Sequence, residues 1–192
     1  RQKIFLLTAL LCAVAQGAWA QNYDVWDGVT MTKPEEDNYH VIHIKKASEL
    51  AYIRDNYDKE EWNEVEEYVI ELSVSHYVWY DPAYERPISL DADIDMGDAV
   101  SWIPLGWTGS SETHFEGTFY GNGHTIRIHT TGATANYQGL FSGIDDEGRV
   151  ENLHVVADIH CSRSRLVGGI AGENDGTIEN CWVSGLVQSD WR

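Results

Sequence analysis

Three aspartates stand at alternate positions in the middle of the chain: Asp91, Asp93 and Asp95. Carboxylate oxygens are the ligands that calcium prefers, so this spacing makes a calcium site the first chemistry to consider, with Asp98 as a further donor. An EF-hand loop needs glycine at its sixth place and an acid at its twelfth, where this chain has Met96 and Trp102. The favoured interpretation is therefore the solvent-facing side of a strand, with weak calcium binding as the alternative.

Hydrolytic chemistry has little support in the residue pattern. Asp145 and Asp146 superficially resemble elements of pectin hydrolases, but they stand beside Glu147-Gly148, in a composition typical of a β-turn. The zinc motif His-Glu-x-x-His is absent, and His40 and His43 are three residues apart with no third ligand nearby. The sequence therefore predicts no enzyme activity, no metal and no cofactor for this chain.

Aromatic side chains are the remaining candidates for a binding role. Flat rings that are exposed on a loop can stack on a sugar or anchor a protein partner. Trp102, beside a proline, is instead predicted to close the apolar interior. The candidate binding residues are Trp79, Tyr80, Tyr84 and Trp107.

The elements that must position these residues are indicated by an internal repeat. A Gly-rich segment followed by Val150-Glu151-Asn152-Leu153 recurs 28 residues later, ending in Ile178-Glu179-Asn180-Cys181. A period of this length is typical of a solenoid, in which each unit buries its apolar face against the next one. Val150 is expected to stack on Ile178 and Val155 on Val183, and the interval from Ile126 to Val150 is expected to be another coil.

Glycine and asparagine recur at fixed places in this repeat. Glycines are expected at corners that need a positive φ, and asparagines at successive corners are expected to stack as a ladder along the solenoid. The repeat residues are Gly139, Gly143, Asn152, Gly169, Gly172, Gly176 and Asn180.

Regular elements are predicted upstream of the repeat. Leu50, Ile53 and Tyr57 have helical spacing, which predicts a helix from Ala47 to about residue 57. Strands are predicted over 40–44 and 68–75 by alternation, and over 90–96, where apolar residues alternate with the three aspartates.

The N-terminal residues have the pattern of an export signal. Arg1 and Lys3 precede an apolar run and then Ala18-Trp19-Ala20, which fits cleavage before Gln21. The run is too short to anchor the protein across a membrane. We therefore expect a signal peptide over 1–20, an exposed leader over 21–42, a cap with a helix and strands over 43–101, and β-helix coils over 102–192.

Charge and cysteine content limit the partners and the compartment. The formal net charge of −18 argues against nucleic acid or an anionic membrane as partner. Beyond the signal the chain has two cysteines, Cys161 and Cys181. A disulfide is an open alternative in an oxidising compartment, but buried free thiols are favoured, because Cys181 aligns with the apolar Leu153.

The repeat and its lead-in resemble exported bacterial proteins that carry the GLUG motif. The matching residues are Gly139-Leu140-Phe141 with Gly143, 167–181, and upstream 90–96, Trp102 with Pro104, and 115–126. The resemblance implies a right-handed parallel β-helix with an N-terminal α/β cap, secreted by or displayed on Bacteroides-like bacteria. Members are often adhesin-like, and some are immunoglobulin-cleaving metallopeptidases. Since they often carry more coils, the resemblance also implies a C-terminally truncated piece.

These observations favour an exported, non-enzymatic surface or secreted protein. Its β-helix is expected to be a rigid scaffold for contact with a host or dietary glycan, or with a host surface protein. The alternatives are a non-catalytic segment of a larger secreted peptidase and a β-helix polysaccharide lyase or hydrolase.

Overall fold

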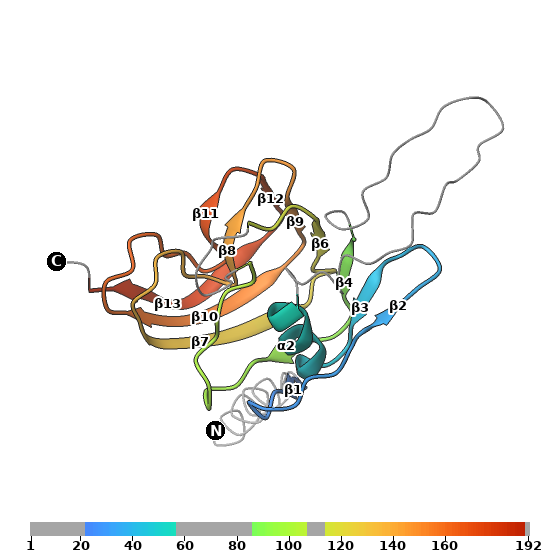
Figure 1. Ribbon diagram of the computed structural model, residues 1–192, viewed down its shortest axis with the longest axis horizontal. Helices are drawn as coiled ribbons and strands as arrows, with labels where there is room; N and C mark the ends of the chain where they lie inside the picture. The colour runs from blue at the N-terminus through green and yellow to red at the C-terminus, as the bar shows by residue number, and fades with distance from the viewer. Residues whose placement is uncertain (1–21, 57–85, 107–113, 191–192) are drawn as a thin grey trace, which may run out of the picture.

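The chain folds as a parallel β-helix with a short helix near its N-terminal end, as a computed structural model shows (Figure 1). The structure describes residues 22–56, 86–106 and 114–190. Three sheets surround an apolar interior, and their strands are parallel except for one at the N-terminal edge of the six-stranded sheet. The order of the strands in each sheet follows the coils of the chain. The predicted all-β solenoid is confirmed.

The third and fourth coils show the repeating unit most completely. The third coil consists of β8 (Phe141–Ile144), β9 (Arg149–Glu151) and β10 (His154–Cys161). The fourth consists of β11 (Ala171–Asn174), β12 (Thr177–Glu179) and β13 (Trp182–Ser189). Each strand pairs in parallel with its counterpart one coil away, so each coil adds one strand to each sheet.

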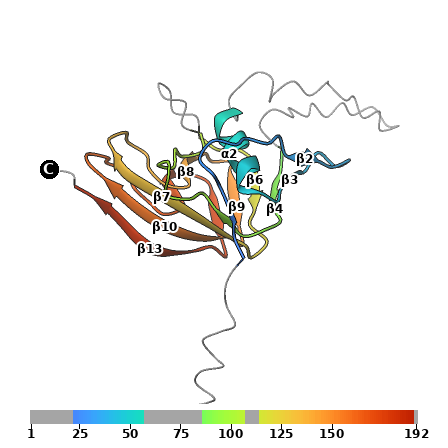
Figure 2. The same cartoon turned by 90° about the horizontal axis from the view of Figure 1, so that it is seen from below.

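The earlier coils continue two of these sheets. β6 (Thr118–Tyr120) pairs with β9, and β7 (Thr125–Ala133) pairs with β10. Before them, β4 (Ile88–Leu90) pairs with β6, and β5 (Ile94–Asp95) pairs with β7. The strands β7, β10 and β13 lie side by side as the longest strands in Figures 1 and 2.

The predicted register of the repeat is confirmed, with one correction. Val150 pairs with Ile178 and Val155 pairs with Val183. The expected coil from Ile126 to Val150 is wrong, because Ile126 pairs with Val155 and Val150 pairs with Phe119. The two misassigned residues are both apolar and inward-facing, so hydrophobic pattern alone could not separate one face of a coil from the next.

The expected strand over 90–96 is two strands in different sheets. β4 ends at Leu90 in the six-stranded sheet, and β5 begins at Ile94 in the five-stranded sheet. Leu90, Ile94 and Met96 all remain buried, so the inward alternation continues across the corner. A corner that keeps every second side chain inward looks like one continuous strand in the sequence.

The N-terminal segment, residues 22–42, is largely exposed, but parts of it pair with or pack against the solenoid. β1 (Asp24–Val25) pairs with β5, and β2 (Glu35–Glu36) pairs antiparallel with β3 (Ile42–Ile44). Trp26 is only 5% exposed and belongs to the core. Because β4 and β5 continue the sheets of the later coils, stacked coils begin before residue 102.

The predicted helix is confirmed as α2 (Ala47–Asn56). Its first turn is capped from two sides: the Glu49 carboxylate accepts from the backbone N–H of Lys46 at 2.9 Å, and Asp24 accepts from the N–H of Ala47 at 2.6 Å. Leu50 and Ile53 are fully buried. The helix therefore covers the apolar end of the coils.

Asparagines, not the repeat glycines, hold the left-handed corners. Asn152 and Asn180 have φ values of 52° and 51° at equivalent places in two coils. Asn122, in the longer corner of the preceding coil, has a φ of 53°, although the register places Gly121 opposite Asn152. None of the five repeat glycines, all in the described part of the chain, has a φ in this range. They lie where other parts of the chain come close: a Cβ on Gly176 would lie 2.2 Å from the carbonyl oxygen of Asp145.

Both cysteines are free thiols. Cys161 is buried among the core side chains, and Cys181 is half-buried with its Sγ 3.2 Å from the carbonyl oxygen of Glu179. Burial raises the pKa of each thiol.

Candidate functional site

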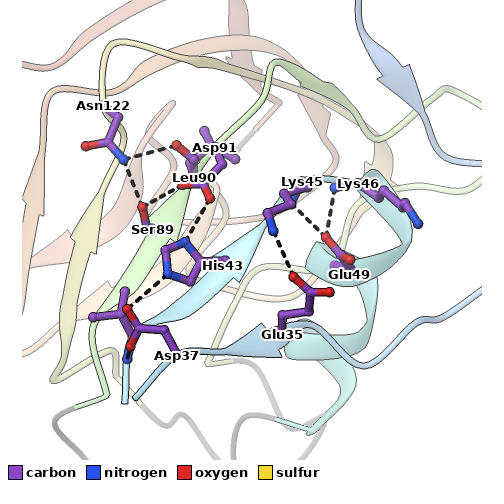
Figure 3. A network of polar contacts seen from close by, with 11 residues as sticks. Glu35, Asp37, His43, Lys45, Lys46, Glu49, Ser89, Leu90, Asp91 and Asn122 are labelled. Carbon is purple, nitrogen blue, oxygen red and sulfur yellow. Dashed lines mark hydrogen bonds and ion pairs between the residues drawn. The ribbon is translucent and has the colours of Figure 1, made fainter. Parts of the chain in front are cut away.

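The described residues form a polar pocket at the N-terminal end of the six-stranded sheet. The pocket is open to solvent and has a volume of about 540 Å³. It lies where the hairpin of β2 and β3 meets β4 (Figure 3). Its lining residues are Glu35, Glu36, Asp37, His43, Lys45 and Asp91.

The β2–β3 hairpin positions His43 at the centre of this pocket. Ile42 and Ile44 point into the core, so His43 between them must face outward. Asp37 shapes the connecting turn, since its carboxylate accepts from the backbone N–H groups of Tyr39 at 2.8 Å and Val41 at 3.0 Å.

His43 bridges two carboxylates that are far apart in the sequence. Its Nδ1 lies 2.8 Å from Asp91, and its Nε2 lies 3.4 Å from Asp37. The hydrogen bond to Asp91 raises the pKa of His43 above its ordinary value. Burial opposes this effect on the pKa, and the hydrogen bond to Asp37 adds a smaller rise. The pKa of Asp37 is lowered, chiefly by the backbone N–H of Val41. The three groups therefore favour an imidazolium between two carboxylates.

The network continues from Asp91 into the next coil. The Ser89 hydroxyl donates to the second carboxylate oxygen of Asp91 at 2.7 Å, and the Asn122 amide donates to the Ser89 oxygen at 2.9 Å (Figure 3). These contacts hold Asp91 in place from the side opposite to His43. The corner asparagine thus helps to orient the pocket.

A second ion pair borders the pocket. Lys45 lies 2.8 Å from Glu35, and this contact raises the pKa of the lysine and lowers that of the glutamate. Both side chains are largely exposed, so the pair contributes little to stability.

The pocket contains the residue types of a hydrolase but not their required arrangement. In a serine triad the histidine accepts the serine proton, whereas here Ser89 donates to Asp91 and both nitrogens of His43 face carboxylates. A glycosidase needs space for the sugar between its two carboxyl groups. Here the imidazole occupies the space between Asp37 and Asp91. The arrangement is therefore suited to hydrogen bonding and to holding a proton, rather than to hydrolysis.

The three alternate aspartates do not converge on one point. Asp91 bonds His43, Asp93 accepts from the N–H of Thr125 at 2.9 Å, and Asp95 accepts from the N–H of Gly97 at 2.8 Å. The corner between β4 and β5 separates them. Within residues 22–56, 86–106 and 114–190, no three His, Cys, Asp or Glu side chains are placed to hold one metal ion.

The predicted aromatic binding residues are not placed by the structure. Trp79, Tyr80, Tyr84 and Trp107 all lie outside the described residues, as does the predicted signal segment. Trp102 is 2% exposed, as expected for a residue of the apolar interior.

The sequence analysis noted His43 only as half of a weak histidine pair. The pocket depends on the parallel pairing of β3 with β4, which aligns His43 with Ser89. That pairing joins strands 46 residues apart in the chain. The one available signal was His43 between two inward isoleucines, close to Asp37.

Comparisons with known proteins give partial matches. The chain is 36% identical over 101 residues to a protein of Evansella cellulosilytica described as a Gly-rich membrane protein, covering 51% of this chain and 11% of that protein. It is 30% identical over 114 residues to halomucin of Haloquadratum walsbyi, covering 54% of this chain and 1% of halomucin. The chain thus spans a small part of these relatives. No family model and no solved structure matches it.

No helix among the described residues has the length and apolar content needed to cross a membrane.

Proposed function

We propose that this chain is part of an exported surface or secreted protein, adhesin-like and without enzyme activity, whose solenoid is a rigid scaffold for glycan contact. The observation that carries the proposal is the stacking of coils in register, because it repeats outward-facing side chains along straight rows. Such rows form an extended surface on which a long ligand can make many equivalent contacts.

Two further observations support this role. One relative is described as a membrane protein, which agrees with a location at the cell surface. The net charge of −18 keeps an exported protein soluble and disfavours nucleic acid as a partner. A host surface protein is the other class of ligand that an adhesin-like scaffold accommodates.

Absence of catalysis is part of the proposal. The pocket around His43 supports it, because the imidazole separates the two carboxylates that would have to face a substrate. The chain is then expected to bind a glycan without changing it.

A glycan array combined with an assay for reducing sugar tests the proposal. The purified protein is expected to bind at least one glycan class and to release no reducing ends from the glycans that it binds. Release of reducing ends would contradict the scaffold role and favour a carbohydrase. Absence of glycan binding, together with capture of one host surface protein, would replace the glycan with a protein ligand.

A further inference from the structure

The outer face of the five-stranded sheet carries side chains that the function above leaves unassigned. Along β10 the residues alternate, with Val155, Ala157 and Ile159 fully buried and the residues between them facing outward. Parallel pairing places Thr125, His154 and Trp182 in one row across β7, β10 and β13. Thr125 is buried in this row, whereas Trp182 at its other end is exposed. The three strands lie side by side in Figure 2.

An aromatic stack is the centre of this face. The rings of His154 and Trp182 are 4.9 Å apart and inclined by 17°. The imidazole is held at both nitrogens, by the Ser184 hydroxyl at 2.8 Å and the Thr125 hydroxyl at 3.3 Å. Trp182 remains 50% exposed. The protein thus fixes the orientation of an indole while leaving half of its surface open to a ligand.

A second apolar side chain follows on the same strand. Leu186 faces outward four residues after Trp182 and is also 50% exposed. Ser184 lies between them on the same face and provides a hydroxyl. This alternation of apolar and hydroxyl groups matches a sugar polymer, whose rings present C–H faces and hydroxyl edges.

The charged groups on this face have partners within it. Arg127 lies 3.4 Å from Asp95, and Asp158 lies between His129 at 3.3 Å and His160 at 3.1 Å. Burial lowers the pKa of His154, which favours an uncharged imidazole in the stack at neutral pH. These few charges contrast with the net charge of −18 for the chain. An uncharged ligand fits the face better than an acidic or a basic one.

We infer that the outer face of β7, β10 and β13 is a binding site for a neutral polysaccharide, with Trp182 stacked on a sugar ring and Ser184 next to its hydroxyl groups. The inference rests on the proposed function, since it names the site and the ligand class of that scaffold. Trp182 is the main contact, and His154 is the residue that positions it.

Affinity electrophoresis tests the site with named probes: soluble β-glucan, xyloglucan and galactomannan as neutral polymers, and polygalacturonate as an acidic one. The protein is expected to be retarded by at least one neutral polymer and not by polygalacturonate. Trp182→Ala is expected to weaken that binding about tenfold, which corresponds to a stacking contribution of about 1.4 kcal/mol. His154→Ala is expected to weaken it less.

Two control variants distinguish loss of the binding site from loss of the folded structure. Trp182→Phe retains a flat ring and is expected to recover most of the binding. Tyr39→Ala removes an aromatic side chain that is 85% exposed on the distant β2–β3 hairpin, and it should bind like the unchanged protein. Melting temperatures of all variants are expected to be similar, since Trp182 and Tyr39 lie on the surface.

The outcomes distinguish failure of the site from failure of the function. Neutral-polymer binding that Trp182→Ala leaves unchanged would overturn the site and leave the glycan scaffold intact. Preferential retardation by polygalacturonate would overturn the neutral ligand class. Absence of binding to all four polymers, together with an empty glycan array, would overturn both proposals.

Discussion

The third and fourth coils have matched apolar side chains at several paired positions, but only the third coil buries these fully. Val155 is fully buried and its counterpart Val183 is 45% exposed, although the two residues are identical and directly paired. Val150 and Ile178 differ in the same way, at 0% and 36%. In the described part of the chain, β10 has a neighbour on each side, whereas β13 has one.

This contrast shows where a solenoid gains its stability. A coil is one layer thick and cannot bury its own inward side chains, so each neighbour covers about half of them. Hydrophobic stabilisation should therefore differ between the two coils, while local backbone requirements should be the same. Matched substitutions in the two coils can distinguish the hydrophobic contribution from the backbone contribution.

The largest difference is expected from one substitution made at two matched positions. Val155→Ala should lower the free energy of unfolding by about 2–3 kcal/mol, because it removes buried methyl groups and leaves a cavity. Val183→Ala should cost less than about 1 kcal/mol, since half of that side chain is already in water. Urea denaturation of both variants measures the difference, and equal losses would contradict the account of the coils.

Substitutions at two matching glycines, Gly148 and Gly176, should destabilise the third and fourth coils equally, unlike the valine substitutions. A Cβ on Gly148 would lie 2.2 Å from the carbonyl oxygen of Phe115, and one on Gly176 would lie 2.2 Å from that of Asp145. Both contacts are with backbone, which cannot rotate away. Gly148→Ala and Gly176→Ala should therefore each cost about 1–3 kcal/mol in urea denaturation, in the closed and the open coil alike. If Gly176→Ala left the free energy of unfolding unchanged, the fourth coil would have to shift easily to make room for the added methyl group.

The repeat could be predicted from the sequence because its period also sets the register. Asn152 and Asn180 mark equivalent corners, and once they are aligned the pairs Val150–Ile178 and Val155–Val183 follow. The assignment of Ile126 to the wrong face failed because the earlier coil has a different length: Phe119 and Val150 are 31 residues apart, against 28 for Val150 and Ile178.

The N-terminal pocket could not be predicted in the same way. β1 and β2 have two residues each, too few to show any alternation. Burial of Trp26 and the contact of His43 with Asp91 both depend on pairing between distant segments. A pattern that occurs once has no second copy to fix its register, so its partners become visible only in three dimensions.

The corner asparagines should have similar effects in both coils. Asn152 and Asn180 have φ values of 52° and 51°, a left-handed conformation that costs most side chains about 1 kcal/mol more than it costs asparagine or glycine. Asn152→Ala and Asn180→Ala should each lower the free energy of unfolding by about 1 kcal/mol, as measured by urea denaturation. Asn→Gly at either place should be close to neutral. If glycine were as destabilising as alanine, the asparagine side chain rather than its backbone would be the important feature.

The smallest effect is expected at the pocket, as a dependence of stability on pH. The pKa of His43 is raised above its ordinary 6.5 in the folded protein, so its contribution to stability is fully present below about pH 6.5 and is lost as the pH rises through the raised value. The pKa of Asp37 is lowered from 3.8, so its contribution is present above that value and is lost as the pH falls through the lowered value.

Between about pH 3.8 and pH 6.5, the stabilising contributions of His43 and of Asp37 are both fully present. The melting temperature of the unchanged protein should therefore fall slightly as the pH rises from about 6 to 9, relative to that of His43→Gln, whose amide does not titrate. His160→Gln is the matched control, because that histidine also contacts an aspartate but lies on the outer face of β10, away from the pocket. If the two variants differed from the unchanged protein by the same amount at every pH, the bridge between Asp37 and Asp91 would have no special stabilising effect. A larger difference for His43→Gln would indicate that the N-terminal end is held by titratable contacts, whereas the closed coils are held by buried hydrocarbon.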